Sequence, residues 1–277
     1  MVKGKISKKE KTKNKGEKKL RRPLLCDFHI HTTFSDGEMK LREVIDLYGV
    51  NGFDVIAITD HVFDTQCPLS LNMINKGAYV DNFDRYFWAI KKASTYARKK
   101  YDLLIIPGIE VTNNNVGFHI LGLDIKKTID ANLSAKEVIE EIHHQEGLAI
   151  ACHPYYKISE LQDRQKIEET TIYLWENRER YLDLIDAWEI ANRDDLFSVV
   201  GLSKLPFLAN SDFHEKKHIY SWKTQIYTSK DPSSVKNAIK EQKISLALFR
   251  DETEALSSPH LAGKDYFNLA FPQLVAT

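Results

Sequence analysis

Six segments of this sequence combine the alternating pattern of a β-strand with a metal-binding type of side chain near their end. Bulky apolar residues alternate in them with small or polar residues, and side chains on a strand alternate between its two faces. One face of each strand therefore suits packing under helices, while the other brings a histidine or a carboxylate toward the carboxyl end. The segments cover residues 24–32, 54–60, 103–111, 116–125, 148–153 and 206–213.

Helical patterns lie between these segments and narrow the class of fold. Residues 39–48 and 82–101 carry apolar stripes of helical spacing. Ser134 and Glu137 form the capping box of a third helix at 135–145. Strand–helix alternation predicts an α/β fold with a mostly parallel sheet. Ligand-type residues on six strand ends favour a closed barrel, with its active site at the carboxyl ends, over a doubly wound sheet with one switch point.

The rest of the chain is assigned by the same patterns. Residues 62–79 show no clear period and are predicted to form a loop. Residues 157–183 are charged and mostly helical, which indicates an excursion beside the barrel. Further strands are expected at 186–192 and 222–229, and further helices at 195–205 and 231–242.

Length and composition are compatible with one large domain at residues 23–277. The chain has 277 residues, of which 43% are hydrophobic, enough for the core of one barrel. The longest apolar runs have the length of a strand, so no transmembrane helix is expected. Three cysteines without a CxxC spacing argue against a disulfide framework and favour the reducing cytoplasm.

The neutral net charge hides a basic amino-terminal segment. Residues 1–22 hold 11 Lys and Arg and two Glu, a charge of +9, which leaves 28 Lys and Arg and 37 Asp and Glu, or −9, in the rest. Such a segment is too poor in apolar residues to form a core and is predicted to be a disordered tail. Lys-rich runs bind polyanions, so weak contact with nucleic acid is the alternative role.

Histidines and carboxylates from these strand ends and one turn form a candidate metal centre. Six of the ten histidines belong to it, while His143, His144, His218 and His260 are expected on the surface or on helices. His29 and His31, two residues apart on one strand, point to the same side. The full set is His29, His31, Asp36, His61, Glu110, His119, His153, Asp212 and His214.

The residue types restrict the metal and its count. Imidazole and carboxylate without thiolate suit Zn²⁺, Mn²⁺ or Fe²⁺, whereas oxygen ligands alone would favour Mg²⁺ or Ca²⁺. Nine ligands exceed the needs of one catalytic zinc, so two or three divalent ions are expected. Glu110 is the expected bridge because a carboxylate has two oxygens to share. The positive charge that remains would attract an anion such as phosphate.

These motifs resemble the polymerase and histidinol phosphatase (PHP) family of metal-dependent phosphoesterases. The matching stretches are HIHTTFSDG at 29–37, TDH at 59–61, GIE at 108–110, HILGL at 119–123, His153-Pro154 and NSDFH at 210–214. The resemblance implies a distorted, TIM-like (β/α)₇ barrel with three metals. It assigns His29, His31, Glu110 and Asp212 to one metal, Glu110, His119 and His153 to the second, and Asp36, His61 and His214 to the third.

The expected reaction is hydrolysis of a phosphoester by a metal-bridging hydroxide, because coordination lowers the pKa of water from 15.7 to about 7. Glu110, His61, Asp212 and His214 are the candidate catalytic residues. Arg193 either grips a phosphate oxygen or pairs with a neighbouring aspartate, Asp194 or Asp195. Tyr155 and Lys157 are candidates for lining the mouth of the site.

Other functions compete with hydrolysis of small phosphoesters. A nuclease acting on oligonucleotide phosphodiesters would explain the basic tail, but the acidic body would repel a long polyanion. An amidohydrolase fits poorly because no strand ends in a lysine that could bridge two metals. A non-catalytic, metal-stabilised interaction module would not need all nine ligand positions. The sequence does not indicate the oligomeric state.

Deletion of residues 1–22 tests whether the tail takes part in chemistry. The turnover of a small phosphoester should stay within about a factor of three, or about 0.65 kcal/mol in the activation barrier, because a solvated tail does not contact the site. Steady-state kinetics of the full and shortened chains measure this. A loss of activity far beyond threefold would show that the tail reaches the site.

Overall fold

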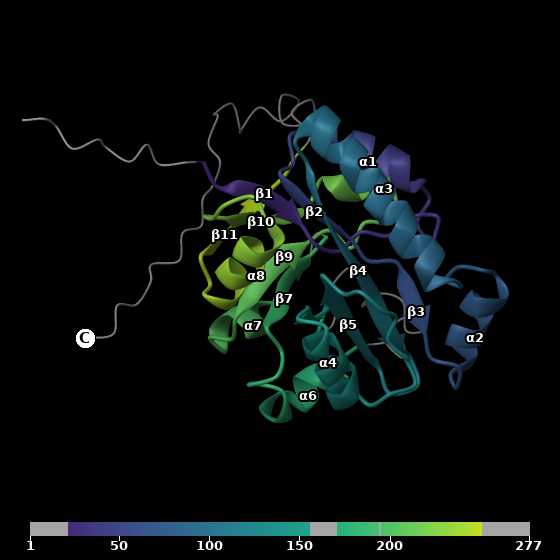
Figure 1. The fold of residues 1–277 in the computed structure, drawn as a ribbon. Helices are drawn as coiled ribbons and strands as arrows, with labels where there is room; N and C mark the ends of the chain where they lie inside the picture. Colours follow the sequence, from purple (N-terminus) through teal and green to yellow (C-terminus); the bar gives the residue numbers. More distant parts are fainter. Residues whose placement is uncertain (1–21, 156–170, 194, 251–277) are drawn as a thin grey trace, which may run out of the picture.

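A single curled β-sheet runs through the computed structural model, which describes residues 22–155, 171–193 and 195–250 (Figure 1). Along the sheet the strand order is β11-β10-β1-β2-β4-β5-β6-β7-β8, with β3 paired to β4 and β9 paired to β7. The strands are β1 (Leu24–Asp27), β2 (Val55–Ile58), β3 (His61–Phe63), β4 (Leu104–Asn113), β5 (Phe118–Leu123), β6 (Leu148–Ala151), β7 (Ala187–Asn192), β8 (Asp195–Leu196), β9 (Phe207–Asn210), β10 (Trp222–Ile226) and β11 (Ile244–Leu248).

The curl brings the end of β9 beside the end of β1. The backbone N–H of Phe213 donates to the carbonyl of His29 at 3.0 Å, and the N–H of His31 donates to the carbonyl of Phe213 at 2.8 Å. The parallel pairs include β1–β2, β2–β4, β6–β7 and β7–β9. The predicted α/β class is confirmed, and its sheet curls into a half-barrel.

Antiparallel pairs interrupt the parallel sheet. Strands β4, β5 and β6 are antiparallel neighbours. For β4 and β5 the reason is the Asn113–Gly117 turn, which is too short for the crossover that parallel strands require. Strand β10 is antiparallel to β1 and to β11. The expectation at 222–229 contained β10, but the sequence analysis did not identify β11 at all.

The helices cover the sheet. Helix α1 lies beside α3 in Figure 1, and α8 lies near β10 and β11. None of the helices in the described ranges is both long and apolar enough to cross a bilayer. The helices are α1 (Leu41–Val50), α2 (Pro68–Asn75), α3 (Phe83–Tyr101), α4 (Ala135–His144), α6 (Tyr173–Glu176), α7 (Ser198–Leu202) and α8 (Pro232–Lys240).

Several predicted elements match and others do not. Ser134 and Glu137 form the expected capping box of α4. The predicted loop at 62–79 was wrong, because it contains most of β3 and the whole of α2, with Pro68 in the first helical turn. The predicted helix at 195–205 is shortened to α7 by β8. Arg22 of the predicted tail pairs with Asp54 at 2.7 Å, whereas residues 1–21 and 156–170 lie outside the described part.

Two apolar clusters lie on opposite faces of the sheet. The outer cluster packs Ile56, Ile58 and Ile109 against residues of α1, α3 and α4. The inner cluster joins residues of facing strands with Val235 and Ile239 of α8. It also contains four residues at β1 and β6 whose side chains the alternating pattern predicted to pack under the outer helices. That prediction was wrong for these four residues. These residues are Cys26, Phe28, Ile150 and Cys152.

Tyr86 of α3 ties two strands together beneath the outer cluster. Its side chain is 1% exposed, and its hydroxyl contacts the carbonyls of Ile58 at 3.1 Å and Gly108 at 2.9 Å. The backbone N–H of Asp60 donates to the same hydroxyl at 3.2 Å. Tyr86 therefore satisfies buried backbone groups of β2 and β4 just before both strands deliver site residues.

Replacing Tyr86 by phenylalanine should lower the free energy of unfolding by about 1–3 kcal/mol, because the N–H of Asp60 loses its buried acceptor. Denaturant unfolding measures the change. Tyr96→Phe is the control on the same helix, because the hydroxyl of Tyr96 donates to the partly exposed Asp46. This variant should lower the free energy of unfolding by less than Tyr86→Phe does. Equal costs for the two variants would contradict the role of Tyr86.

Candidate metal centre

All nine candidate ligands lie together where the strands end. Glu110 belongs to β4, His61 to β3 and His119 to β5, while His153 follows β6 by two residues. His29 and His31 follow β1, and the remaining ligands come from the turn after it and from the segment after β9. His29, His31 and Glu110 are fully buried, and His61, His153 and Asp212 are each less than 8% exposed.

The first group of donor atoms surrounds one oxygen of Glu110. Oε2 of Glu110 lies 3.0 Å from His29 Nε2 and 3.1 Å from His31 Nε2. Both imidazole nitrogens lie 3.5 Å from Asp212 Oδ1. Four ligands bound tetrahedrally at 2.0–2.1 Å from one ion stand about 3.3 Å apart. The spacing of these four atoms is thus close to that of a tetrahedral metal site.

The second group surrounds the other oxygen of Glu110. Oε1 lies 2.7 Å from His119 Nδ1 and 3.6 Å from His153 Nε2. The two oxygens of this one carboxylate therefore face two different sets of imidazoles. This is the arrangement that a bridging ligand requires.

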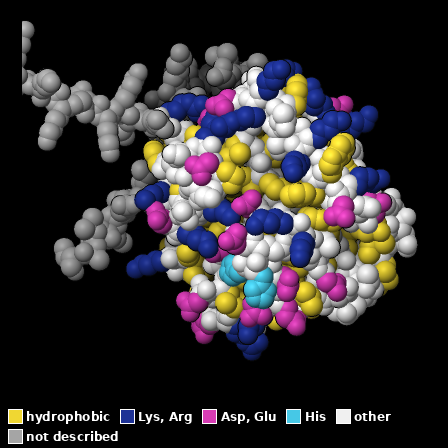
Figure 2. All heavy atoms as spheres, viewed as in Figure 1, with side chains coloured by type: hydrophobic (Ala, Val, Ile, Leu, Met, Phe, Trp, Pro, Cys, Tyr) yellow, Lys and Arg dark blue, Asp and Glu magenta, His cyan; other side chains and the backbone are white. Residues whose placement is uncertain are grey.

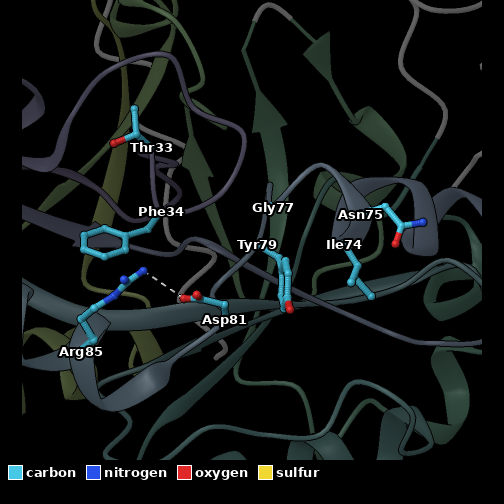
Figure 3. Close-up of a pocket in the computed structure, with 8 residues that line it drawn as sticks. All are labelled: Thr33, Phe34, Ile74, Asn75, Gly77, Tyr79, Asp81 and Arg85. Carbon is cyan, nitrogen blue, oxygen red and sulfur yellow. Dashed lines mark hydrogen bonds and ion pairs between the residues drawn. The ribbon is translucent and has the colours of Figure 1, made fainter.

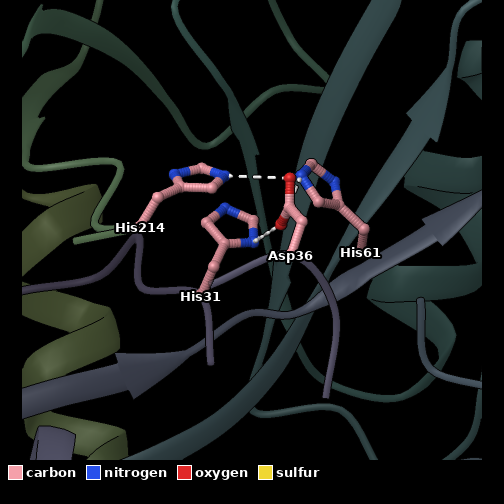
Figure 4. Close-up of side chains that lie close together, drawn as sticks. All are labelled: His31, Asp36, His61 and His214. Carbon is pink, nitrogen blue, oxygen red and sulfur yellow. Dashed lines mark ion pairs between the residues drawn. The ribbon is translucent and has the colours of Figure 1, made fainter. Parts of the chain in front are cut away.

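The third group forms around Asp36, as Figure 4 shows. Its carboxylate oxygens lie 3.6 Å from His61 Nε2 and 3.3 Å from His214 Nε2. His31 also reaches this group, because its Nδ1 lies 3.8 Å from Asp36 Oδ1. His31 consequently stands between the first and third groups.

Outer hydrogen bonds orient the imidazoles toward the centre. His119 Nε2 lies 3.2 Å from the amide oxygen of Asn114, and its Nδ1 lies 2.7 Å from Glu110 Oε1. With Nε2–H donating to Asn114, Nδ1 would be the nitrogen that binds a cation. His61 Nδ1 contacts the hydroxyl of Thr112 at 2.7 Å, and its Nε2 faces Asp36. Such partners hold a ring in place and select its tautomer.

Thr171 does the same for His153. Its hydroxyl donates to the carbonyl of His153 at 2.8 Å and so accepts from Nδ1–H of the same residue at 2.9 Å. The lone pair of His153 is then on Nε2, which faces Glu110. The backbone of His153 has φ +23° and that of Asp212 has φ +48°, so two ligand positions adopt the left-handed region that non-glycine residues rarely occupy.

Glu189 of β7 is a site residue that the sequence analysis missed. It is fully buried, and its Oε1 accepts from His29 Nδ1–H at 2.9 Å. Its Oε2 accepts from the backbone N–H of His153 at 2.6 Å and from Asn192 Nδ2 at 2.8 Å. The sequence signal that could have identified Glu189 is that it is the single carboxylate of a strand whose other residues are apolar, apart from Asn192. Glu189 thus positions one ligand of the first group and one of the second.

Asp60 supports the turn that carries Asp36. Its carboxylate accepts from the backbone N–H and the hydroxyl of Thr32, at 2.7 and 2.9 Å, and from the Ser35 hydroxyl at 2.7 Å. A Cβ on Gly37 would lie 2.6 Å from the backbone of His31, so the turn needs glycine here. The aspartate of the TDH motif is therefore a support and not a ligand in this geometry.

Two buried atoms of the cluster have no hydrogen-bond partner among the described residues. They are Nε2 of His31 and Oδ1 of Asp36. Buried polar atoms are normally satisfied, and both belong to groups of atoms spaced to bind a cation. Divalent ions at these positions would satisfy both, so the residues present fit a metal centre.

The cluster perturbs the acid–base properties of its members. Burial alone lowers the pKa of His29 and His31, but the surrounding carboxylates outweigh burial, raising the pKa of His31 to about 9 and that of His29 well above its usual value. Burial also opposes the ionised form of Glu110, yet His61 and His29 hold the pKa of Glu110 well below its usual range. Metal ions must displace protons from these imidazoles, so metal affinity falls as the pH is lowered.

Two of the three candidate substrate-binding residues, Arg193 and Tyr155, lie in the described part of the structure. Arg193 lies at the centre, where its guanidinium contacts Asp212 Oδ2 at 3.1 Å and the carbonyl of Asp212 at 3.3 Å. Asp194, one of the two aspartates predicted as an alternative partner, lies outside the described residues. Tyr155 packs its ring edge-on against Trp175, with the centroids 6.0 Å apart. Lys157 lies outside the described residues.

The other histidines split into surface and supporting roles. Figure 2 shows histidine side chains at the surface over α4, which carries His143 and the largely exposed His144. His218 differs from expectation, because its Nδ1 accepts the backbone N–H of the ligand residue His214 at 3.1 Å. His260 lies outside the described residues.

Comparisons with known proteins identify the family of this chain. The PHP domain family model matches residues 27–231, which is more than half of the chain, and the chain belongs to this family. It is 27% identical over 192 residues to an uncharacterised protein of Methanocaldococcus jannaschii, covering 65% of this chain and 90% of that one. The PHP identification made from the motifs is confirmed.

Solved structures share the fold. A two-domain protein of Bacteroides vulgatus, described as containing a predicted PHP-like metal-dependent phosphoesterase, aligns with a TM-score of 0.63 at 19% identity, over 87% of this chain and 70% of that one. PsfC of Pseudomonas syringae aligns with a TM-score of 0.53 at 13% identity, over 86% and 96% of the two chains. At sequence identities of 19% and 13%, these similarities show a shared fold alone.

Replacing Glu189 by glutamine should weaken metal binding about 10- to 100-fold, the usual effect of losing an outer partner of a ligand. The amide cannot accept from all the donors that converge on the carboxylate. Competition with a chelator measures the affinity. Glu140→Gln, on the surface of α4, is the matched control and should change nothing; an unaltered affinity in Glu189→Gln would remove the positioning role.

Proposed function

We propose that this protein hydrolyses small phosphoesters, such as phosphomonoesters or nucleotides, with divalent metal ions held by the nine clustered residues. The observation that carries the proposal is Glu110, whose two oxygens face two groups of imidazoles at 2.7–3.6 Å. A pair of ions bridged by one carboxylate is the usual platform for in-line displacement at phosphorus.

The groups of donor atoms suggest how the ions divide the ligands. The first ion would take His29, His31, Glu110 and Asp212, and the second would take Glu110, His119 and His153. Asp36, His61 and His214 would hold a third. Histidine and carboxylate ligands suit Zn²⁺, Mn²⁺ or Fe²⁺. When bound, such ions lower the pKa of water and neutralise the oxygens of a phosphate.

The fold supports the same reading. Seven strands follow one another around the curled sheet, in the order β1, β2, β4, β5, β6, β7 and β9. The segment after β9 pairs with the segment after β1 through the bridge between Ile30 and Phe213. We infer that these seven strands form a distorted (β/α)₇ barrel. The carboxyl ends of the other six strands and the amino end of the antiparallel β5, which carries His119, then share one opening. This is the end of a barrel at which barrel enzymes bind substrate.

Arg193 is the proposed phosphate clamp. Its side chain is 31% exposed while its guanidinium contacts Asp212, and its NH2 nitrogen lies 3.1 Å from His214 Nδ1. The guanidinium therefore stands at the edge of the centre, between ligand residues and solvent. A planar cation in this place can bond a phosphate oxygen bound by the ions.

A pocket of about 290 Å³ is the proposed place for the leaving group (Figure 3). None of the nine candidate ligands lines it, but both of its walls connect to ligand residues. Thr33 and Phe34 on one wall belong to the turn between His31 and Asp36. On the other wall, Tyr79 precedes Val80, whose N–H donates to the carbonyl of His61 at 2.9 Å. Both walls are thus attached to ligand residues. Ile74, Asn75, Gly77 and Tyr79 of segment 62–79 line this pocket, so this segment is proposed to contribute to the choice of substrate.

The charge of the chain favours small substrates. Residues 23–277 carry −9, and Figure 2 shows Lys and Arg interspersed with Asp and Glu on the face in view. A long polyanion would be repelled by the body, whereas a single phosphate can be neutralised at the centre. The basic segment 1–22 is the feature that favours the alternative, a nuclease acting on oligonucleotide ends.

A substrate screen on metal-reconstituted protein, combined with two variants, tests the proposal. Mononucleotides and sugar phosphates should be turned over faster than oligonucleotides. Glu110→Gln should lose at least one ion per chain and most activity, on the order of 10³-fold, because an amide cannot bridge two cations. Elemental analysis and phosphate release measure the two effects.

Arg193→Ala is the matched control, since it should keep the full metal content and mainly raise KM. It separates assembly of the centre from contact with substrate. Full metal content with near-normal turnover in Glu110→Gln would contradict the bridging role. Faster turnover of long single strands by the chain without residues 1–22 would favour the nuclease instead.

A further inference from the structure

A cysteine thiol lies among the donor atoms of the metal centre. Cys152 follows β6 directly, is 1% exposed and precedes the ligand residue His153. One ligand-type atom from each of Cys152, His29 and Glu110 falls in a group whose members lie within 4.8 Å of one another. The alternating pattern had assigned this side chain to the outer helices.

The backbone explains why the thiol faces the centre. Cys152 and Ile150 point into the inner cluster, and the next residue in a regular strand would point outward. The positive φ of His153 instead turns its ring back toward Glu110. Two consecutive side chains, Cys152 and His153, therefore reach the same carboxylate.

A second observation indicates that this position needs a cation. His29, one member of the thiol's group, also belongs to the group with His31 and Asp212. Nε2 of His31 is buried, lies 3.1 Å from Glu110 Oε2 and has no hydrogen-bond partner among the described residues. The thiol itself makes a long contact, 3.8 Å from Sγ to the carbonyl of Ile150.

We propose that Cys152 supplies a thiolate as a fifth ligand to the first ion, beside His29, His31, Glu110 and Asp212. This proposal rests on the metal centre of the proposed function. On binding, the S–H bond breaks, an S–metal bond forms and the proton passes to solvent. Thiolate is a soft ligand, so the centre should prefer thiophilic ions such as Zn²⁺, Co²⁺ and Cd²⁺ over Mn²⁺.

The chain offers a matched control in Cys26. Its thiol is also fully buried and belongs to the same inner cluster. It contacts the carbonyl of Leu24 at 3.3 Å, and no donor group in the described ranges includes it. The two cysteines thus share burial and apolar surroundings but differ in access to the centre.

Absorption spectra of the full chain loaded with Co²⁺ test the proposal. A near-ultraviolet band from thiolate-to-cobalt charge transfer should be present in the parent protein and in Cys26→Ala, and absent in Cys152→Ala. Cd²⁺ affinity should fall at least about tenfold in Cys152→Ala, while Mn²⁺ affinity changes far less. If the alanine variant does not fold, Cys152→Ser keeps the volume and should also lack the band.

The outcomes separate this proposal from the proposed function. A band that persists in Cys152→Ala or Cys152→Ser, or that is absent from cobalt-loaded parent protein, overturns the ligand role even if phosphoesters are hydrolysed. A band specific to Cys152 with no hydrolysis of any phosphoester supports the ligand and overturns the function. Failure of the parent protein to bind cobalt overturns both.

Discussion

The carboxylate of Glu110 is the interaction on which the rest of the centre depends. It is fully buried near the end of β4, and five histidines have a ring nitrogen within 3.6 Å of its oxygens, of which His119 and His29 are the nearest. A buried charge is stable only when other charges and hydrogen bonds compensate it. The imidazoles provide this compensation, so the same contacts stabilise Glu110 and gather the ligands.

Outside this carboxylate lies a layer of groups that point each ring inward. Glu189, Thr112, Asn114 and Thr171 each take one ring nitrogen, and the other nitrogen faces the centre. These partners come from β7, β4, the turn after β4 and the segment before α6. The curl of the sheet brings such distant parts of the chain together, which is how the fold determines the chemistry of the site.

Much of this could be predicted because ligand type and strand end coincide in the sequence. The PHP family, the α/β class and the list of clustered residues all followed from motifs on single strands. Strand parity held from Cys26 to Phe28 and from Ile150 to Cys152, but these side chains face the inner cluster and not the outer helices. The left-handed backbone of His153 breaks the alternation only after Cys152. Glu189 was missed because its partners are distant in sequence, and α2 was missed because its apolar spacing is irregular.

His31 has a consequence for the order in which ions fill the centre. Its Nε2 faces Glu110 and Asp212, while its Nδ1 faces Asp36. A neutral imidazole has one lone pair and one N–H, so it can serve only one of these two neighbours at a time. An ion bound to Nε2 would leave the N–H on Nδ1, directed at Asp36. Binding at the two neighbouring positions would therefore not be independent.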